Sequence, residues 1–199
     1  ILRLEEGLPE IKAHTSIQRA EYEVARRLVE ATTGQEPQRV EVFDLDVIDP
    51  SLPRVVLIQG CLTDSHHVHS GVSYYGQSLR ESLATFVHPN ELLDGVMTVD
   101  TTRCVGYFPT TWDWQNHPLV LDLYQEHRQR LNLVGIILER IRFDTYPGKE
   151  MIAQNTAQLA AALKVDAALV SWLGSGNSFV DVMLTVRACE QLGIRTVLI

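Results

Sequence analysis

The stretch from Asp94 to Pro118 gathers a cysteine, five threonines and two tryptophans. Cys104 follows Arg103, whose positive charge favours the thiolate, the nucleophilic form of a cysteine. Thr101 and Thr102 could donate hydrogen bonds or act as nucleophiles. The stretch has no sustained helical or strand periodicity, and polar loops of this length are usually functional. We therefore expect the reactive group here, with an inert, buried Cys104 as the alternative.

A second candidate is the segment Gly174, Ser175, Gly176 and Asn177, which follows a predicted strand and precedes a predicted helix. Free main-chain N–H groups at a helix start, together with small residues, can hold a carboxylate. The segment lacks the G-x-G-x-x-G and G-x-x-x-x-G-K patterns of nucleotide-binding loops. We expect it to bind a substrate carboxylate. A plain turn, with Asn177 or Ser178 as helix cap, is the alternative.

The histidines His66, His67 and His69 have a spacing that resembles a metal site, and Asp64 could add an oxygen ligand. The pattern offers no fourth convergent ligand. We therefore expect no metal, and we assign His67 to a loop that faces the substrate or a neighbouring subunit.

The cysteines Cys61, Cys104 and Cys189 are odd in number, far apart and without a C-x-x-C pair, which favours reduced thiols. We expect Cys61 and Cys189 to be buried. Trp112 and Trp114 could line a pocket, form an interface or fill the core, and these interpretations stay open.

Regular elements must position these residues. The run at residues 55–59, which is apolar and largely β-branched up to its last residue, Gln59, is typical of a strand buried in a parallel sheet. Further strand patterns cover residues 39–45, 84–87, 133–138, 167–171 and 196–199. Helical patterns cover residues 16–31, 77–83, 117–131, 151–163 and 178–192. This alternation predicts an α/β, Rossmann-like, doubly wound fold with a mostly parallel sheet and helices on both faces.

Ligands of such sheets bind beyond the carboxyl ends of the strands, so the polar loops 60–76, 140–149 and 172–177 qualify. We expect residues 1–36 to form an N-terminal strand and helix arm that packs on the core, and residues 37–199 to form the α/β domain. Because the chain starts without Met and stops inside a predicted strand, we expect it to belong to a longer polypeptide.

The net charge of -8 and the absence of a basic stripe argue against nucleic acid and anionic membranes as partners. No apolar run approaches the roughly 18 residues that span a bilayer, and the start shows no signal-peptide pattern. We therefore expect a cytoplasmic protein.

Seven short motifs occur in one order along the whole chain. In this order they resemble the middle and later part of the glycine/sarcosine/betaine reductase component B proprotein: Glu41-Val42-Phe43, Pro53-Arg54-Val55, His88 to Gly95, Gln115-Asn116-His117-Pro118, Leu131 to Ile137, Gly174 to Asn177 with Asp181, and Gly193 to Val197.

The resemblance implies an oxidoreductase subunit of a hetero- or homo-oligomeric complex that cleaves a C–N bond in a small amino acid or betaine-like substrate. In that family the precursor cuts itself before a cysteine, and the new amino terminus becomes a pyruvoyl group. This carbonyl engages the substrate amine as a Schiff base. A selenol or thiol of a partner subunit then attacks the α-carbon, and the carbon fragment passes to a carrier protein.

On this sequence the resemblance implies Cys104 as the processed or reactive residue, with Thr102 and Thr101 as alternatives. It also implies that the substrate site is lined by Gln115, Asn116 and His117. The family's second cysteine is absent here, and elimination from Thr102 would give a 2-oxobutyryl group instead of pyruvoyl. The alternative function is a paralogue without self-processing that serves as a structural or substrate-binding partner of the catalytic subunit.

Overall fold

The computed structural model describes residues 6–7, 10–63, 71–100, 109–141, 145–173 and 176–199. Its helices are α1 (Glu10–Thr32), α2 (Pro89–Leu93), α3 (Thr111–Gln115), α4 (Pro118–Glu126), α5 (Tyr146–Ala162), α6 (Ser178–Gln191) and the 3-10 turn η1 (Leu79–Glu81). Its strands are β1 (Arg54–Leu62), β2 (Gly71–Tyr74), β3 (Gln77–Ser78), β4 (Thr85–Val87), β5 (Met97–Asp100), β6 (Asn132–Ile141), β7 (Ala167–Trp172) and β8 (Arg195–Leu198).

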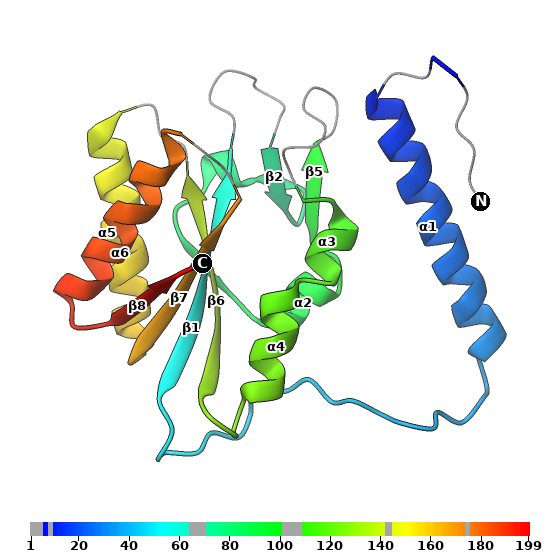
Figure 1. Ribbon diagram of the computed structural model, residues 1–199, viewed down its shortest axis with the longest axis horizontal. Coiled ribbons are helices and arrows are strands. Elements are labelled where there is room, and N and C mark those ends of the chain that lie inside the picture. Colours follow the sequence, from blue (N-terminus) through cyan, green and yellow to red (C-terminus); the bar gives the residue numbers. More distant parts are fainter. Residues whose placement is uncertain (1–5, 8–9, 64–70, 101–108, 142–144, 174–175) are drawn as a thin grey trace.

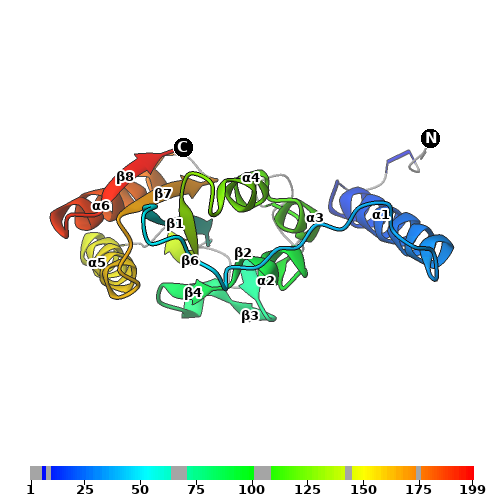
Figure 2. The same ribbon diagram turned by 90° about the horizontal axis from the view of Figure 1, so that it is seen from below.

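A five-stranded sheet with the order β4-β6-β1-β7-β8 forms the centre of the molecule. β1 pairs in parallel with β6 and β7, β8 pairs in parallel with β7, and β4 is an antiparallel edge strand. Figures 1 and 2 show α5 and α6 on one face of this sheet and α4 on the other. The predicted α/β, Rossmann-like architecture with a mostly parallel sheet is therefore confirmed.

The core follows directly from the apolar runs in the central strands. Val56, Leu57 and Ile58 of β1 are fully buried, as are Ile136 and Ile137 of β6. A strand with helices over both faces has no side for polar residues, and this explains why these runs do not alternate. A smaller antiparallel sheet, with the order β3-β2-β5, lies beside the main one.

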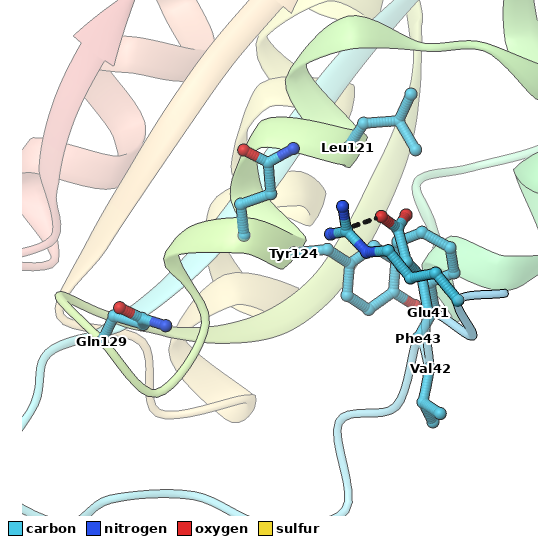
Figure 3. A pocket seen from close by; sticks show the side chains of 8 residues that line it. Glu41, Val42, Phe43, Leu121, Tyr124 and Gln129 are labelled. Atoms are coloured by element: carbon cyan, nitrogen blue, oxygen red, sulfur yellow. Dashed lines mark ion pairs between the residues drawn. The ribbon is translucent and has the colours of Figure 1, made fainter.

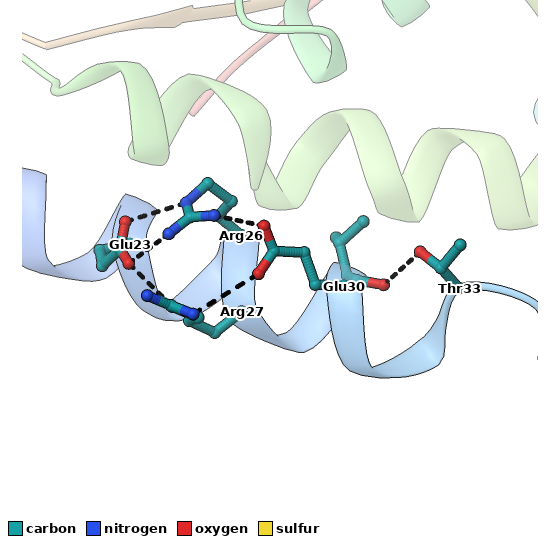
Figure 4. A network of polar contacts seen from close by, with 6 residues as sticks. Glu23, Arg26, Arg27, Glu30 and Thr33 are labelled. Carbon is teal, nitrogen blue, oxygen red and sulfur yellow. Dashed lines mark hydrogen bonds and ion pairs between the residues drawn. The ribbon is translucent and has the colours of Figure 1, made fainter.

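Helix α1 covers the expected helical segment and begins earlier than residue 16. Its polar face carries ion pairs among Glu23, Arg26, Arg27 and Glu30, which Figure 4 shows together with the hydrogen bond from Thr33 to the preceding turn. These side chains are half exposed, so each pair contributes little to stability. In a contact between α1 and α3, the Tyr22 hydroxyl donates to the Gln115 side chain at 3.4 Å.

Residues 39–45 do not form the predicted strand. Burial does not alternate along the segment, because residues 39–42 are all exposed, including the apolar Val40 and Val42, and residues 43–45 are all half-buried. The Phe43 ring packs on Tyr124 with ring centroids 5.0 Å apart. The Phe43 carbonyl accepts a hydrogen bond from the Asn90 side chain at 2.9 Å and does not join a sheet ladder. Alternation therefore predicted neither the buried side chains nor the secondary structure of this segment.

The predicted helix at residues 77–83 is also wrong. Tyr75 and Gly76 both have positive φ angles, 48° and 75°, and they form a two-residue hairpin turn between β2 and β3. After β3, Ser78 caps only the short η1 turn. Gly76 between two strand-forming segments was the hairpin signal in the sequence.

Candidate functional site

A pocket of about 240 Å³ lies at the carboxyl ends of β1 and β7. The two strands are adjacent and parallel in the sheet, and there Gln59 pairs with Ser171 and Gly60 pairs with Trp172. The chain passes from β1 to β6 on one side and then to β7 on the other, so β1 and β7 flank the point where the strand order reverses. Doubly wound sheets bind their ligands at this switch point. The pocket is lined by Gln59, Pro109, Asp113, Trp114, His117, Pro118, Ser171, Trp172 and Leu173.

The helices α3 and α4 form one wall of the pocket, and the first residues of each helix fix its position. Thr110 caps α3 in a reciprocal arrangement: its N–H and hydroxyl both donate to the Asp113 carboxylate at 2.7 Å, and its hydroxyl accepts from the Asp113 N–H at 3.3 Å. Pro118 occupies the first position of α4, where a missing N–H does no harm. His117 therefore stands at the junction between the two helices, with its ring 5.8 Å from the buried ring of Trp114.

The link between this wall and the sheet is a hydrogen bond between two uncharged side chains. The His117 ring nitrogen Nε2 lies 3.0 Å from Oε1 of Gln59, whose side chain is buried in β1. Burial lowers the pKa of His117, and its own main-chain carbonyl opposes this effect only in part. The imidazole is therefore neutral at neutral pH, and the pocket contains a His–Gln pair without a net charge.

Close packing between β1 and β7 places Trp172 in the opposite wall. A Cβ atom built on Gly60 would lie 2.8 Å from the Trp172 Cβ and 3.3 Å from Ile141. Only glycine fits there without moving one of these neighbours. The Trp172 ring then packs on Phe179 of α6 with centroids 5.7 Å apart, which ties the pocket wall to the next helix.

Of the sequence-predicted binding residues, the structure places His117 in the pocket. Gln115 points elsewhere, because its amide contacts Gly95 and accepts the hydrogen bond from Tyr22. Asn116 is exposed and its side chain donates to the Trp112 carbonyl at 2.9 Å, which closes the end of α3. The structure therefore separates these three neighbours in the sequence.

Gly176 and Asn177 are exposed at the start of α6, and the Asn177 side chain makes no cap hydrogen bond. They do not line the pocket, although Leu173 in the same connection does. The remaining predicted site residues lie outside the described part of the chain: His67, Thr101, Thr102, Cys104, Gly174 and Ser175. Pro109, which follows the predicted reactive stretch, lines the pocket.

Sequence reasoning missed two lining residues of the two strands, Gln59 and Ser171, whereas Trp172 was part of the candidate loop 172–177. Gln59 ends an otherwise apolar run, and a buried amide at the carboxyl end of a central parallel strand was a usable signal. The structure also assigns different places to the two neighbouring tryptophans: Trp114 is 2% exposed and lines the pocket, whereas Trp112 is 42% exposed. Cys61 and Cys189 are free and buried, as predicted.

A second polar cluster is buried between β6 and the helices α5 and α6. Lys149 of α5 forms an ion pair with Asp181 of α6, and the Thr185 hydroxyl donates to Glu139 of β6. Burial raises the pKa of Glu139 to about 8; the Thr185 and Thr156 hydroxyls oppose this effect and the charge of Asp181 adds to it. Glu139 is therefore mostly protonated at neutral pH, and the cluster joins three elements beneath the sheet.

A larger, open hollow of about 580 Å³ lies between residues 39–43 and α4 (Figure 3). Figure 3 shows Leu121 and Tyr124 of α4 on one side and Phe43 on the other. Gln129, which lines one end of the hollow, lies three positions before the first residue of β6, so the hollow is at the amino end of that parallel strand. Because ligands of such sheets bind at the carboxyl ends, we assign the site to the smaller pocket.

Within the described residues, no group of three or more His, Cys, Asp or Glu side chains is placed to hold a metal ion. The same part of the chain contains no helix that is long and apolar enough to cross a membrane. The predicted loop with His66, His67 and His69 lies outside the described residues.

Comparison with known proteins agrees with the sequence motifs. The sarcosine reductase complex component B subunit alpha of Peptoclostridium acidaminophilum is 32% identical over 200 residues, which cover 89% of this chain and 44% of the relative. The betaine reductase complex component B subunit alpha of the same organism is 28% identical over 192 residues, covering 94% of this chain and 43% of the relative. No solved structure matches the chain.

The glycine reductase complex component B subunits alpha and beta of Acetoanaerobium sticklandii are 26% identical over 207 residues, covering 98% of this chain and 46% of the relative. The chain thus spans less than half the length of these curated relatives. The family model described as glycine/sarcosine/betaine reductase component B subunits matches residues 1–199. The chain is therefore a divergent member of the glycine/sarcosine/betaine reductase component B family.

Proposed function

We propose that this chain forms the substrate-binding part of a reductase complex that cleaves the C–N bond of a small amino acid or betaine-like substrate. The observation that carries the proposal is the pocket at the carboxyl ends of β1 and β7, with its aromatic walls and its uncharged pair of Gln59 and His117. The relatives are named as components of glycine, sarcosine and betaine reductase complexes, which supports a substrate of this size and class.

The walls of the pocket suit an ammonium group. Trp114 and Trp172 supply aromatic surfaces, which attract a cation most strongly where water is excluded. Asp113 adds a carboxylate that lines the same pocket and is held in place by Thr110. The neutral His117 adds no positive charge that would repel the ammonium.

The reaction requires two groups besides these walls. A carbonyl formed by self-processing at Cys104, with Thr102 and Thr101 as alternatives, would supply an electrophile for the amine. A partner subunit with a selenol or thiol would supply the nucleophile for the α-carbon, and a carrier protein would accept the carbon fragment. Because Pro109 lines the pocket, a short covalent connection joins the proposed processed residue to the site.

Binding to the pocket is tested by calorimetric titration of the chain with glycine, sarcosine and betaine. We expect at least one of these ligands to bind, and we expect Trp172→Ala to weaken its binding at least tenfold. Trp112→Ala is the matched control, because Trp112 is exposed and does not line the pocket. Equal binding by the two variants would contradict the assigned site.

Self-processing is tested by intact mass together with carbonyl chemistry. We expect two fragments that meet within residues 101–104, and the later fragment should react with hydrazine or be reduced by borohydride. A single uncut chain that ignores both reagents would eliminate the carbonyl. If that chain still bound the ligand in the pocket, it would act as a substrate-binding partner without its own prosthetic group.

A further inference from the structure

Helix α1 carries an apolar stripe that is largely exposed. Val24, Leu28 and Val29 lie on one side of the helix, and their side chains are 58%, 63% and 65% exposed. Figures 1 and 2 show α1 apart from the main sheet, on the far side of α3. A helix alone in water is only marginally stable, and most protein helices are stabilised by packing such a stripe on another surface. The stripe of α1 therefore requires a partner surface.

A second exposed apolar surface lies on the sheet, over β7 and β8. Thr196 of β8 faces α6, because its hydroxyl donates to Glu190 at 2.8 Å. Alternation along the strand then places Arg195 and Val197 on the opposite side of the sheet, together with Leu169, the register partner of Val197. Val197 is 57% exposed and Leu169 is half-buried. We call this surface the β7–β8 face; it consists of Leu169, Ser171, Arg195, Val197 and Ile199.

The β7–β8 face borders the pocket, because Ser171 belongs to both. Gln59, the register partner of Ser171, bonds to His117 at the start of α4, so α4 lies on the same side of the sheet. Figure 2 shows α4 beside β1 and no described helix over β8 on this side. Strands of a mostly parallel sheet are normally covered by helices on both faces. The β7–β8 face is therefore suited to bind one more helix next to the pocket.

The stripe of α1 and the β7–β8 face match in charge and in length. Glu21 lies two turns before Leu28 on the same side of α1, and Arg195 begins the exposed side of β8. Among the described residues, neither Glu21 nor Arg195 takes part in an ion pair. Glu21 and Leu28 are about 10 Å apart along a helix, and Arg195 and Ile199 are about 13 Å apart along a strand. With α1 parallel to β8, Glu21 can therefore reach Arg195 while the apolar residues that follow them make contact.

The helix that fits this face is α1 of a second copy. The chain's own α1 lies beyond α3, where Tyr22 bonds to Gln115. Residues 33–42, which connect α1 to the bonded Phe43, are all exposed and leave α1 free to reach a neighbour. In a two-fold dimer each copy gives one α1 and receives one, so all four surfaces are covered. Because the contact is made twice, it can reach the roughly 1,000 Å² that a specific interface buries.

We propose that α1 of one copy packs on the β7–β8 face of a second copy in a reciprocal dimer, with Glu21 paired to Arg195 of the partner subunit. In this orientation the carboxyl-terminal half of α1 lies beside Ser171, so the second copy adds a wall to the pocket. The inference does not depend on the ligand, because both surfaces are formed without one.

The first test measures the mass of the full chain in solution by light scattering and sedimentation equilibrium. We expect twice the 22.4 kDa of one chain. Val24→Asp should weaken the dimer at least tenfold, because it buries a charge in the contact. Val42→Asp is the matched control, because Val42 is 75% exposed and belongs to neither surface. A monomeric wild type, or a Val24→Asp variant as dimeric as Val42→Asp, would overturn the proposal; circular dichroism shows whether the variants are folded.

The second test exchanges the proposed pair of charges. Glu21→Arg and Arg195→Glu each bring like charges together and should weaken the dimer about threefold or more. The chain with both substitutions should recover the wild-type affinity to within about twofold. Glu36→Arg changes the net charge as Glu21→Arg does, at an exposed position between α1 and the sheet, and should leave the dimer unchanged. A double variant that is weaker than either single variant would refute the pairing.

The third test distinguishes a second copy from the chain's own helix. A chain with Val24→Cys is mixed with a chain with Val197→Cys, and a short bismaleimide is added. We expect a cross-linked dimer above the background of the wild type, in which Cys61 and Cys189 are buried. Val42→Cys in place of Val24→Cys should give only the background. If a single chain with both cysteines is linked within itself and the mixture is not linked, α1 binds its own sheet and the proposal is wrong.

Discussion

Replacement of Glu139 by Gln tests whether a protonated carboxyl group is buried beneath the sheet. The side chain is 1% exposed, and burial raises its pKa to about 8 from an ordinary value of 4.5. Glutamine has nearly the same shape and keeps an oxygen that can accept from the Thr185 hydroxyl. The substitution therefore removes the titration with little change in packing.

The sign and size of the effect follow from proton linkage. Between the unfolded and folded pKa values, Glu139 is ionised in the unfolded chain and protonated in the folded one. The folded state then binds one more proton, so the free energy of unfolding falls as pH rises, by about 1.4 kcal/mol per pH unit. From about pH 5.5 to about pH 7, the wild type should lose about 2 kcal/mol relative to Glu139→Gln.

Urea unfolding followed by circular dichroism measures this difference. The wild type and Glu139→Gln are compared at several pH values between about 5.5 and 7, so that the contributions of the histidines and other titrating groups cancel in the difference of their unfolding free energies. Glu126→Gln, in the last turn of α4, is a control, because that carboxylate lies at the surface beside Arg130. Parallel stability profiles of wild type and Glu139→Gln would refute a neutral buried carboxyl group.

Further predictions concern the pocket and the buried ion pair. Gly60→Ala should lower the free energy of unfolding by about 1–3 kcal/mol and weaken ligand binding, because the added Cβ would displace Trp172. Denaturant unfolding measures the first effect and calorimetric titration the second. A variant with unchanged stability and unchanged affinity would contradict the close packing of Gly60 against Trp172. Lys149→Met should destabilise the fold by about 3–5 kcal/mol, measured by urea unfolding, because Asp181 loses its buried cation; a loss below 1 kcal/mol would show that the pair is solvated. Burial lowers the pKa of His117, so below about pH 6.5 its imidazole binds more protons in the unfolded chain than in the folded one. The wild type should therefore lose stability relative to His117→Asn as the solution is acidified. The reverse trend would contradict a neutral imidazole.

The sheet could be predicted because its central strands are buried on both faces. Runs such as Val55 to Ile58 have no polar position for solvent, and this pattern is typical of a parallel sheet covered by helices. Residues 39–45 show the limit of such reasoning. A strand needs a neighbouring strand edge, and no described strand pairs with this segment: Val40 and Val42 are exposed, and the Phe43 carbonyl accepts a hydrogen bond from a side chain.

The candidate site was predicted only in part, because it is assembled from distant segments. His117 was found through a motif and through its place before a helix that starts with proline. Its partner Gln59 lies 58 positions away, and only the parallel pairing of β1 with β7 brings Trp172 to the same pocket. Residues that adjoin His117 in the sequence do not share its pocket, since Gln115 contacts α1 and the Asn116 side chain bonds to the last turn of α3.

The central claim is that a small amino acid binds between the carboxyl ends of β1 and β7. The three tryptophan indoles give the most direct test, because each produces its own N–H signal in a ¹⁵N-correlated NMR spectrum and two of them line the pocket. On titration with glycine or sarcosine, the signals of Trp114 and Trp172 should shift together and saturate, while that of Trp112 should stay in place. Shifts confined to Trp112, or no shift at all, would contradict the assigned site.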